Sequence, residues 1–568
     1  MKILICYVYG SGGNDPFLSL LPVGVGSLVA VLRNAGREAK AANFSGLTTN
    51  AIRKVLAAEQ PDLLGISVMT HNRHDSVRLA ELAKELNPAC FVVFGGPHAT
   101  HRCREILAEC STINAVVLGE GEETLRELAE LLADITLPFS PSPASPLILE
   151  GHRGVRLAAI RGLAFRDGDD IIVTSPRHLL ADLDALLPAF TGFEGGININ
   201  LRQQLEFLIT SRGCPAACSF CSSPHFWGKS LRFRSPRTMV DEIRAIRDRY
   251  GLIYFSIRDD TFTADRKRVI EFCRLLLEER LFILWNCQSR VNAVDEEMLL
   301  WMRRAGCDCI QYGVESGSSA ILTILGKRIS GEQIVRAAKA TRRAGIRLSI
   351  YLMTGIPGET EQDLGETLTL LGALRADDGQ VSPLAYYPGT RLFNEAVERG
   401  DTPADLFERS PEEALYARSD PFVISSTQTL LKTIEKHAPD NFSRKRDLTA
   451  ARRRTGYCHA GNVATGELLA EQGDYTGAEK QYREIVHQEP DNPWGWLLLG
   501  ELWQETGRPG EALGAFRRLA ELVPAHLPAW EALAGLYRVT GDRTEIRRCR
   551  ERTRELTVMN RQTAGGIP

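Results

Sequence analysis

The sequence predicts two α/β units followed by an all-α repeat module, in a chain of 568 residues. Short apolar segments alternate with helical segments over residues 1–135 and again from about 205 to 400, a pattern typical of parallel sheets covered by helices. A periodicity of 34 residues over 457–560 predicts stacked helical pairs. Domains usually hold roughly 100–200 residues, so a chain of this length needs more than one hydrophobic core.

Composition excludes whole classes of protein. The formal net charge of −3, with 24% charged and 44% hydrophobic residues, argues against a globally basic nucleic-acid binder. No uninterrupted apolar run reaches the roughly 18 residues of a membrane span, and the N-terminus enters a strand-like segment without a cleavage site, so we expect a cytoplasmic protein. The 13 cysteines are scattered over a long chain, which does not fit a disulfide framework.

The first unit, residues 1–135, is expected to be a doubly wound, Rossmann-like domain. Its strand candidates are Lys2–Tyr7, Asp62–Ser67, Cys90–Phe94 and Ala115–Leu118. Ligands of such sheets bind at the carboxyl ends of the strands. The residues expected at these ends are Ser67, Gly95, Gly96, Gly119 and Glu120.

Residues 136–200 are expected to form a linker and a small connector. Thr136–Pro146 is rich in Pro and Ser, which is typical of a linker. Within the connector, Arg161–Phe165 and Ile171–Val173 are expected to pair across a turn at Asp167–Asp170.

The second unit, residues 201–400, is expected to be a full or partial (β/α) barrel. Its strand candidates are Phe207–Thr210, Tyr254–Ile257, Leu281–Asn286, Cys309–Gly313, Arg347–Thr354 and Gln380–Leu384. Residues 401–456 are expected to be a linker to the repeats. The basic stretch Ser443–Arg454 is interpreted as solvated linker, with a docking site for an acidic partner as the alternative.

The repeat module, residues 457–560, carries small and apolar residues at matching positions. The pairs are Gly473 and Gly507, Gly507 and Gly541, Trp496 and Trp530, Ala478 and Ala512, and Pro490 and Pro524. This pattern resembles the tetratricopeptide repeat (TPR), and three repeats would form a short solenoid. The alternative is an unrelated helical bundle. The module is expected to bind a protein or peptide partner, with dimerisation as an equal option.

Three cysteines are spaced as metal ligands. Cys214, Cys218 and Cys221 form C-x3-C-x2-C directly after a predicted strand. A cubane iron–sulfur cluster is usually held by four thiolates, so three thiolates on one loop leave one iron open to an outside ligand. Zinc is the alternative, but it needs a fourth ligand, for which His225 is the nearest candidate.

The cysteine spacing, with the aromatic Phe220 before the last cysteine, resembles the radical S-adenosylmethionine (SAM) superfamily. The resemblance implies a [4Fe–4S] cluster whose open iron chelates SAM. It also implies that an electron from the reduced cluster splits SAM and releases a 5′-deoxyadenosyl radical, so an external electron donor is expected.

Later motifs extend the resemblance over roughly 205–395. They are RDDTF at 258–262, SRV at 289–291, GVESGS at 313–318, GIPGET at 355–360 and YPGT at 387–390. By this resemblance the SAM-binding candidates are Asp259, Asp260, Arg290, Glu315, Ser316 and Gly355. The alternative for each polar residue is a helix cap.

The order of glycine motifs in residues 1–135 resembles the cobalamin-binding domain that precedes the barrel in many radical SAM proteins. The resemblance implies that glycines leave room for the nucleotide tail and that Ser67 hydrogen-bonds its base. The Asp-x-His-x-x-Gly motif that supplies an axial histidine is absent, and neither His71 nor His98 has its context. Either cobalamin binds here without a protein histidine, or this domain has lost cobalamin binding.

Together these resemblances imply a cobalamin-dependent radical SAM enzyme, expected to be a methyltransferase acting on an unactivated carbon. The alternatives are a cobalamin-linked radical rearrangement or oxidative cyclisation and, in another class, a non-catalytic iron–sulfur scaffold with TPR repeats. No RNA-binding domain is visible, so no nucleic-acid partner is expected. No motif identifies the substrate. Cys287, Cys307 and Cys309 are interpreted as buried core thiols, with a second cluster as the alternative.

Overall fold

The computed structural model describes residues 1–10, 20–134, 156–409 and 415–562. Its first unit is a seven-stranded sheet in the order β2-β1-β3-β4-β5-β6-β7. The strands are β1 (Lys2–Tyr7), β2 (Glu38–Asn43), β3 (Leu63–Ser67), β4 (Phe91–Gly95), β5 (Ala115–Val117), β6 (Leu163–Asp167) and β7 (Asp170–Val173). The helices are α1 (Val23–Asn34), α2 (Thr49–Glu59), η1 (Thr70–Asn72), α3 (Arg73–Leu86), α4 (Pro97–His101), α5 (Cys103–Glu109) and α6 (Glu122–Asp134).

Strand β1 shows why this sheet is covered on both faces. Ile3 and Ile5 belong to one core cluster, whereas Leu4 and Cys6 belong to the other. Strands β1 to β5 are parallel and the order reverses at β1, which confirms the doubly wound architecture. The expected hairpin also forms, because β6 and β7 pair antiparallel and extend the sheet beyond β5.

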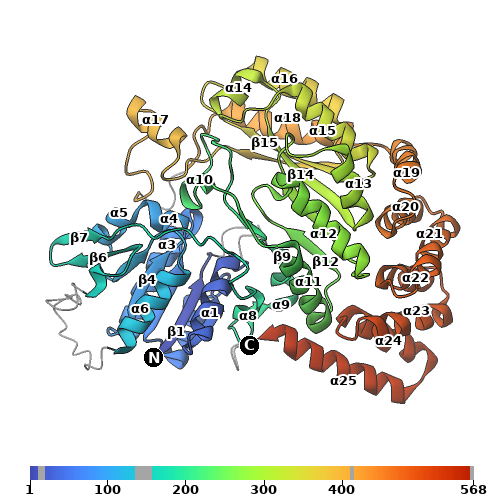
Figure 1. Ribbon diagram of the computed structural model, residues 1–568, viewed down its shortest axis with the longest axis horizontal. Coiled ribbons are helices and arrows are strands. Elements are labelled where there is room, and N and C mark those ends of the chain that lie inside the picture. The colour runs from blue at the N-terminus through green and yellow to red at the C-terminus, as the bar shows by residue number, and fades with distance from the viewer. Residues whose placement is uncertain (11–19, 135–155, 410–414, 563–568) are drawn as a thin grey trace.

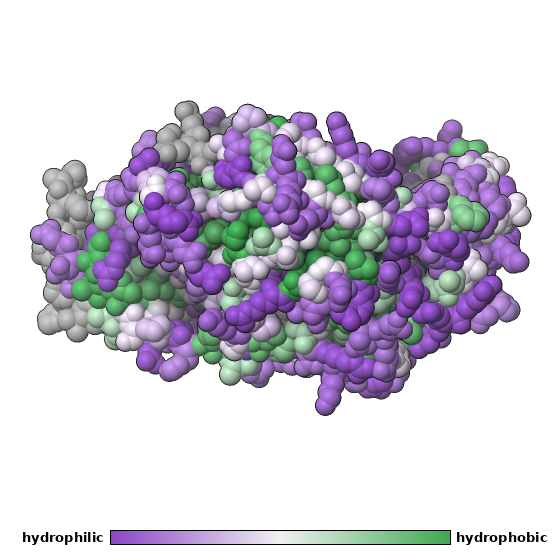
Figure 2. Space-filling view, turned by 90° about the horizontal axis from the view of Figure 1, so that it is seen from above, coloured by the Kyte–Doolittle hydropathy of each residue, from purple (hydrophilic) through white to green (hydrophobic). Residues whose placement is uncertain are grey.

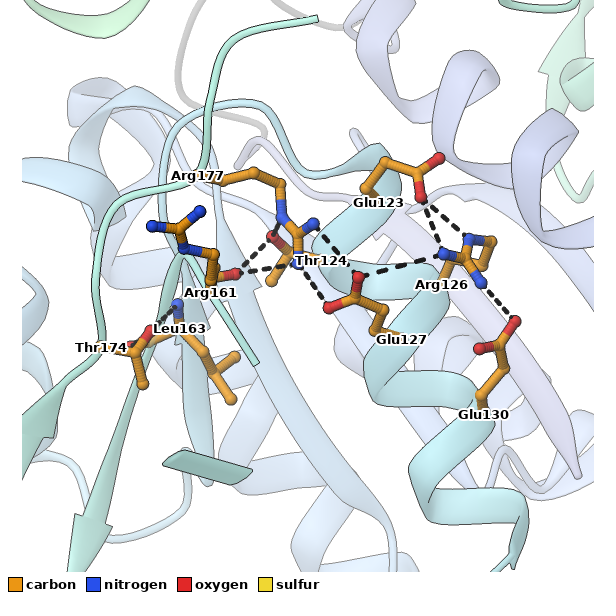
Figure 3. Close-up of polar contacts among 9 residues, drawn as sticks. All are labelled: Glu123, Thr124, Arg126, Glu127, Glu130, Arg161, Leu163, Thr174 and Arg177. Carbon is orange, nitrogen blue, oxygen red and sulfur yellow. Dashed lines mark hydrogen bonds and ion pairs between the residues drawn. The ribbon is translucent and has the colours of Figure 1, made fainter. Parts of the chain in front are cut away.

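The connector is anchored to the first unit. Arg177 donates hydrogen bonds to Thr124 and to the carboxylate of Glu127, both on α6 (Figure 3). Three short elements follow: α8 (Phe190–Phe193), β8 (Ile199–Asn200) and α9 (Leu201–Gln204). The Pro- and Ser-rich linker expected at Thr136–Pro146 lies outside the described residues.

The second unit is an open, all-parallel sheet of six strands in the order β16-β15-β14-β13-β12-β9, a partial barrel. The strands are β9 (Phe207–Leu208), β12 (Tyr254–Ile257), β13 (Leu284–Ser289), β14 (Cys307–Glu315), β15 (Arg347–Thr354) and β16 (Asp378–Pro383), and a separate two-stranded ribbon joins β10 (Ser211–Arg212) to β11 (Arg232–Phe233). The helices are α10 (Ser223–Phe226), α11 (Pro236–Tyr250), η2 (Phe262–Ala264), α12 (Arg266–Glu278), α13 (Glu296–Arg304), α14 (Ser319–Ile324), α15 (Gly331–Arg343), α16 (Glu361–Leu374) and α17 (Arg391–Arg399).

The stretch 401–456, expected as a linker, contains two long helices. Helix α18 (Pro421–His437) begins at the capping side chain of Asp420 and buries Leu430 and Ile434 against the barrel core. Helix α19 (Asn441–Thr455) contains the basic stretch, and its Arg452 pairs with Glu484 of the repeats. These residues therefore form a folded bridge between barrel and repeats.

Six antiparallel helices follow, in three pairs. They are α20 (His459–Glu471), α21 (Tyr475–Gln488), α22 (Pro493–Glu505), α23 (Pro509–Leu522), α24 (Leu527–Thr540) and α25 (Arg543–Asn560). The periodic Gly473, Gly507 and Gly541 all adopt a positive φ at the turn within each pair. The periodic tryptophans repeat one bond, since Trp496 donates to the Pro490 carbonyl and Trp530 to that of Pro524.

The repeat module curves along one side of the barrel and beneath it (Figure 1). His459 and His526 bond the carbonyls of Ile283 and Gly251, and Leu284 joins the apolar core of the repeats. Strand β17 (Arg561–Gln562) then pairs antiparallel with β8, so the end of α25 returns to the connector. Part of the repeat surface is therefore used within the chain itself.

The surface in Figure 2 is mainly hydrophilic, with apolar residues showing in the central part of that face. Within the described ranges, no helix combines the length and apolar character that crossing a bilayer requires.

Candidate functional site

The three motif cysteines lie on the loop between β10 and β11, beside the carboxyl end of the barrel sheet. Cys214 and Cys218 are buried and Cys221 is half-buried, and all three are free thiols. The sulfur of Cys214 lies 3.8 Å from the Thr261 hydroxyl, and that of Cys218 accepts a bond from Arg290 at 3.5 Å. The loop therefore faces the ends of β12 and β13.

The chemistry of these donors fits an iron–sulfur cluster. Burial raises the pKa of Cys221 to about 12, and the nearby Asp260, Cys218 and Cys214 add to this effect. A bound cationic cluster would offset that cost by stabilising the thiolates. In the described part of the chain no three His, Cys, Asp or Glu side chains converge on a single ion. Three thiolates on one loop are the donor set that a [4Fe–4S] cluster with one open iron requires.

The two adjacent aspartates differ in their surroundings. Asp259 is buried and accepts the N–H groups of Thr210 and Ser211 and the Thr210 hydroxyl. It therefore fixes the strand that leads into the cysteine loop. Asp260 accepts the hydroxyl of Ser223. Desolvation raises the pKa of Asp260, and the charge of Asp259 adds to the shift.

Arg290 and Glu315 are brought together by a residue that the motifs did not indicate, Lys327. The ammonium of Lys327 lies 2.6 Å from Glu315 Oε1. The backbone carbonyl of Lys327 accepts a hydrogen bond from Arg290. Both side chains of the ion pair are under 10% exposed. Glu315 has φ +68°, a strained conformation at the end of β14. Cys218, Arg290, Lys327 and Glu315 thus form one continuous polar chain.

Ser316 and Gly355 shape the neighbouring loops. Ser316 is buried and bonds the Thr367 hydroxyl and the N–H of Ser318, which places it within the loop rather than facing open space. Gly355 adopts φ +72° and donates its N–H to Glu359. A Cβ at this position would lie 3.2 Å from the side chain of Val423, so the turn after β15 packs closely against α18.

The strand ends of the first unit open into a cavity of about 720 Å³. Ser67, Gly95, Gly96 and Gly119 all line it. Gly119 adopts φ +66°, and a Cβ built on it would meet nothing within 4 Å, so the space beside this residue is open. The cavity continues to barrel residues that include Arg258 and Gln311. These small residues fit a large ligand lying on the sheet edge.

The two histidines near this edge behave differently. His98 is 3% exposed, bonds Thr70 and packs on Phe407, and burial lowers its pKa to about 3. It is therefore a core histidine. His71 lines the cavity, and its Nε2 lies 2.7 Å from the hydroxyl of Tyr7.

Three further cysteines are buried in the barrel, whereas His225 lies on α10 within the cysteine loop itself. Cys287 and Cys307 are fully buried in the barrel core, and Cys309 is also buried. Burial raises the pKa of Cys307 well above its usual range. His225, the candidate zinc ligand, packs edge-on against His101 with ring centroids 6.4 Å apart.

Glu120 is held by the cysteine loop. Its carboxylate accepts bonds from Arg212 and Arg232, which flank that loop, and from the N–H of Leu180. Neither Arg212 nor Arg232 was predicted from sequence, because the two residues carry no local motif.

Family comparisons match each unit of the fold. Residues 208–371 match the Radical SAM superfamily, residues 17–129 the B12 binding domain, and residues 469–537 the tetratricopeptide repeat. The prediction of these three modules from sequence is therefore confirmed.

The chain is also similar to individual proteins. It is 32% identical over 358 residues to an uncharacterized methyltransferase of Pyrococcus horikoshii, covering 62% of this chain and 72% of the relative. It is 28% identical over 408 residues to the anaerobic magnesium-protoporphyrin IX monomethyl ester cyclase of Rubrivivax gelatinosus, covering 70% of each. The solved structure of the cobalamin-dependent S-adenosylmethionine radical enzyme OxsB with aqua-cobalamin shares the fold, with a TM-score of 0.59, 15% identity and coverage of 99% of this chain and 84% of that one.

Proposed function

Because the chain belongs to the cobalamin-dependent radical SAM family, we propose that it transfers a methyl group to an unactivated carbon. The family matches make it a radical SAM enzyme whose cofactors are a [4Fe–4S] cluster, SAM and cobalamin. When bound, the cluster supplies the electron that cleaves SAM and cobalamin carries the methyl group. We assign the cluster to Cys214, Cys218 and Cys221.

One observation supports this proposal above the others. A single cavity of about 720 Å³ is lined both by Ser67 and Gly119 of the first unit and by Arg258 and Gln311 of the barrel. A methyl group carried at the first sheet edge and a substrate held in the barrel mouth would thus face one shared cavity. Its lining is rich in Leu, Val and Phe, which keeps water away from reactive species.

The chain's own residues would then hold and orient the cofactors. Arg290 donates a bond to the sulfur of Cys218 and so orients this side chain. Asp260 accepts a hydrogen bond from Ser223 of the cysteine loop and would accept the ammonium group of SAM. The Lys327–Glu315 pair would orient the SAM carboxylate and ribose. Asp259 and Ser316 position their loops, and the turn at Gly355 after β15 would lie beside the adenine.

The test is an anaerobic reconstitution with iron, sulfide and hydroxocobalamin, followed by a reductant and SAM labelled as CD₃ on the methyl group. We expect about four irons per chain, 5′-deoxyadenosine as a product, and a product that carries the label when a bacterial metabolite extract is added. Cys218→Ala is expected to form no 5′-deoxyadenosine. A wild type with a full iron content that leaves SAM intact would contradict the proposal.

A second candidate reaction is radical cyclisation or rearrangement without methyl transfer. It is favoured by the similarity to a relative named as a monomethyl ester cyclase. The same labelled extract separates the two, because a cyclisation product carries no CD₃ group.

We further propose that the repeats dock a protein or peptide partner, such as the external electron donor. The module belongs to a class of interaction solenoids. Because α20 and α24 already contact the barrel through His459 and His526, the partner would use the remaining repeat surface.

A further inference from the structure

The two ends of the cysteine loop are held together at its base. Arg212 and Arg232 face one another in the antiparallel pair of β10 and β11. Gly213 begins the loop with φ +93°, and a Cβ there would overlap the carbonyl of Ser230. Only a glycine fits this closure. The base therefore fixes the backbone directly before Cys214, while Cys218 is also held by Arg290.

Both arginines of this base are bound by the first unit. Glu120 Oε1 lies 3.0 Å from Arg212 Nη1 and 2.7 Å from Arg232 Nη1. Arg212 also pairs with Glu122. All four side chains are under 10% exposed. We call these residues (Glu120, Glu122, Arg212 and Arg232) the interdomain ion-pair cluster.

The cluster is fixed from both sides. Glu122 begins α6, and that helix is anchored to the connector through Arg177 (Figure 3). On the barrel side, the guanidinium of Arg212 stacks over Trp227 at 5.1 Å. Four buried charges add little net stability compared with apolar residues in the same place. Any shift of one unit relative to the other, however, leaves one buried charge without its partner, which is costly. Such a cluster is therefore suited to holding one geometry between two units.

The same carboxylates border the cavity. Glu120 and Glu122 line it together with Gly119, and Arg212 lines it from the barrel side. A ligand on the strand end of β5 would touch the loop that carries Glu120 and Glu122. Its binding would restrict the movement of both carboxylates further and, through their ion pairs, that of the base of the cysteine loop.

We propose that the interdomain ion-pair cluster couples cobalamin binding to the geometry of the iron–sulfur loop, so that the two cofactors bind cooperatively. Its four members are positioning residues. The inference rests on the proposed function, since it takes both cofactors to be bound at these sites. Coupling between two sites is reciprocal. A bound iron–sulfur cluster must therefore strengthen cobalamin binding by the same factor by which cobalamin strengthens retention of the iron–sulfur cluster.

The test titrates hydroxocobalamin into the full chain with and without reconstituted iron and sulfide. We expect the wild type loaded with iron and sulfide to bind hydroxocobalamin roughly 5–150-fold more tightly than the unloaded wild type, the usual range of coupling between sites. This ratio of affinities measures the coupling. In Glu122→Gln and Arg212→Lys this ratio should fall towards one. Arg212→Lys keeps the charge but loses the fork that spans both carboxylates. Arg53→Lys is the matched control, because Arg53 and Glu85 form an exposed ion pair at 2.8 Å in the same unit. It should keep the wild-type ratio.

The wild type alone provides a second measurement that needs no variant. Hydroxocobalamin should slow amide hydrogen exchange in residues 211–233 as well as in the first unit. Protection confined to the first unit, or a ratio near one in wild type that binds both groups, would overturn the coupling alone. A wild type with full iron and sulfide that binds no hydroxocobalamin would overturn the proposed function and the coupling with it.

Discussion

Replacing Lys327 with Met tests whether the polar chain beside the cysteine loop is a buried unit. The Lys327 ammonium and Glu315 Oε1 are 2.6 Å apart, with exposures of only 6% and 9%. Removing one partner of a buried pair leaves an uncompensated charge, which costs about 3–5 kcal/mol. For a domain of this size that corresponds to a fall in Tm of roughly 6–20 °C.

The assay is thermal unfolding of the full chain, followed by circular dichroism and by iron content. Lys327→Met combined with Glu315→Gln should recover much of the loss, because no charge is then left unpaired. The matched control is Arg343→Met, since Arg343 and Glu296 form an exposed pair at 3.0 Å in the same unit. It should cost less than about 1 kcal/mol. If Lys327→Met and Arg343→Met have equal effects, the pair is not shielded from water and the reasoning is wrong.

Three other substitutions test separate parts of the structure. Cys218→Ala should lower iron content and abolish 5′-deoxyadenosine formation while leaving the circular dichroism spectrum unchanged; retained SAM cleavage would exclude this cysteine as a ligand. His98 has a folded pKa of about 3 against 6.5 unfolded, so the unfolded chain takes up the extra proton as pH falls below 6.5 and stability falls with it. Between pH 7 and 5 the free energy of unfolding of His98→Gln should therefore fall by about 2 kcal/mol less than that of the wild type. Urea unfolding measures this difference, and parallel pH profiles of the two proteins would contradict it. Gly251→Ala should be far more destabilising than Gly400→Ala, because both have a positive φ but only at Gly251 would the Cβ overlap the carbonyl of Ala525; equal shifts in Tm would show that the repeats do not pack tightly on the barrel.

Most of the fold could be predicted because most of its strands coincide with short apolar segments of the sequence. Lys2–Tyr7, Tyr254–Ile257 and Arg347–Thr354 are strands with the expected bounds. Strand β2 (Glu38–Asn43) was not predicted, because its sequence EAKAAN has no β-branched or aromatic residue. Its pairing with β1 comes from tertiary contact alone.

Strand β13 shows a different limit. The apolar run that begins at Leu281 predicts a strand from that residue, but pairing with β12 begins only at Leu284. Leu281 and Ile283 are buried in the core before the ladder starts. Hydrophobicity therefore located the segment and could not set its register.

The candidate site was predictable where chemistry is local in sequence. The cysteine spacing predicts a ligand loop, but the motif around Asp259 did not reveal that its oxygens are bonded by Thr210 and Ser211, which lie 49 and 48 residues away. Lys327 was not found for the same reason, since a single lysine after a short helix forms no pattern. Its role depends on contact with Glu315 and Arg290.

The pairing of β17 with β8 has a consequence for synthesis on the ribosome. The edge of β8 lies at Ile199–Asn200, between the two α/β units, whereas its partner is Arg561–Gln562. Because the chain emerges from its N-terminus, both α/β units are made long before that partner exists. The edge of β8 therefore waits unpaired for more than half of translation, and we expect a nascent chain stalled before α25 to be susceptible to cleavage near this edge.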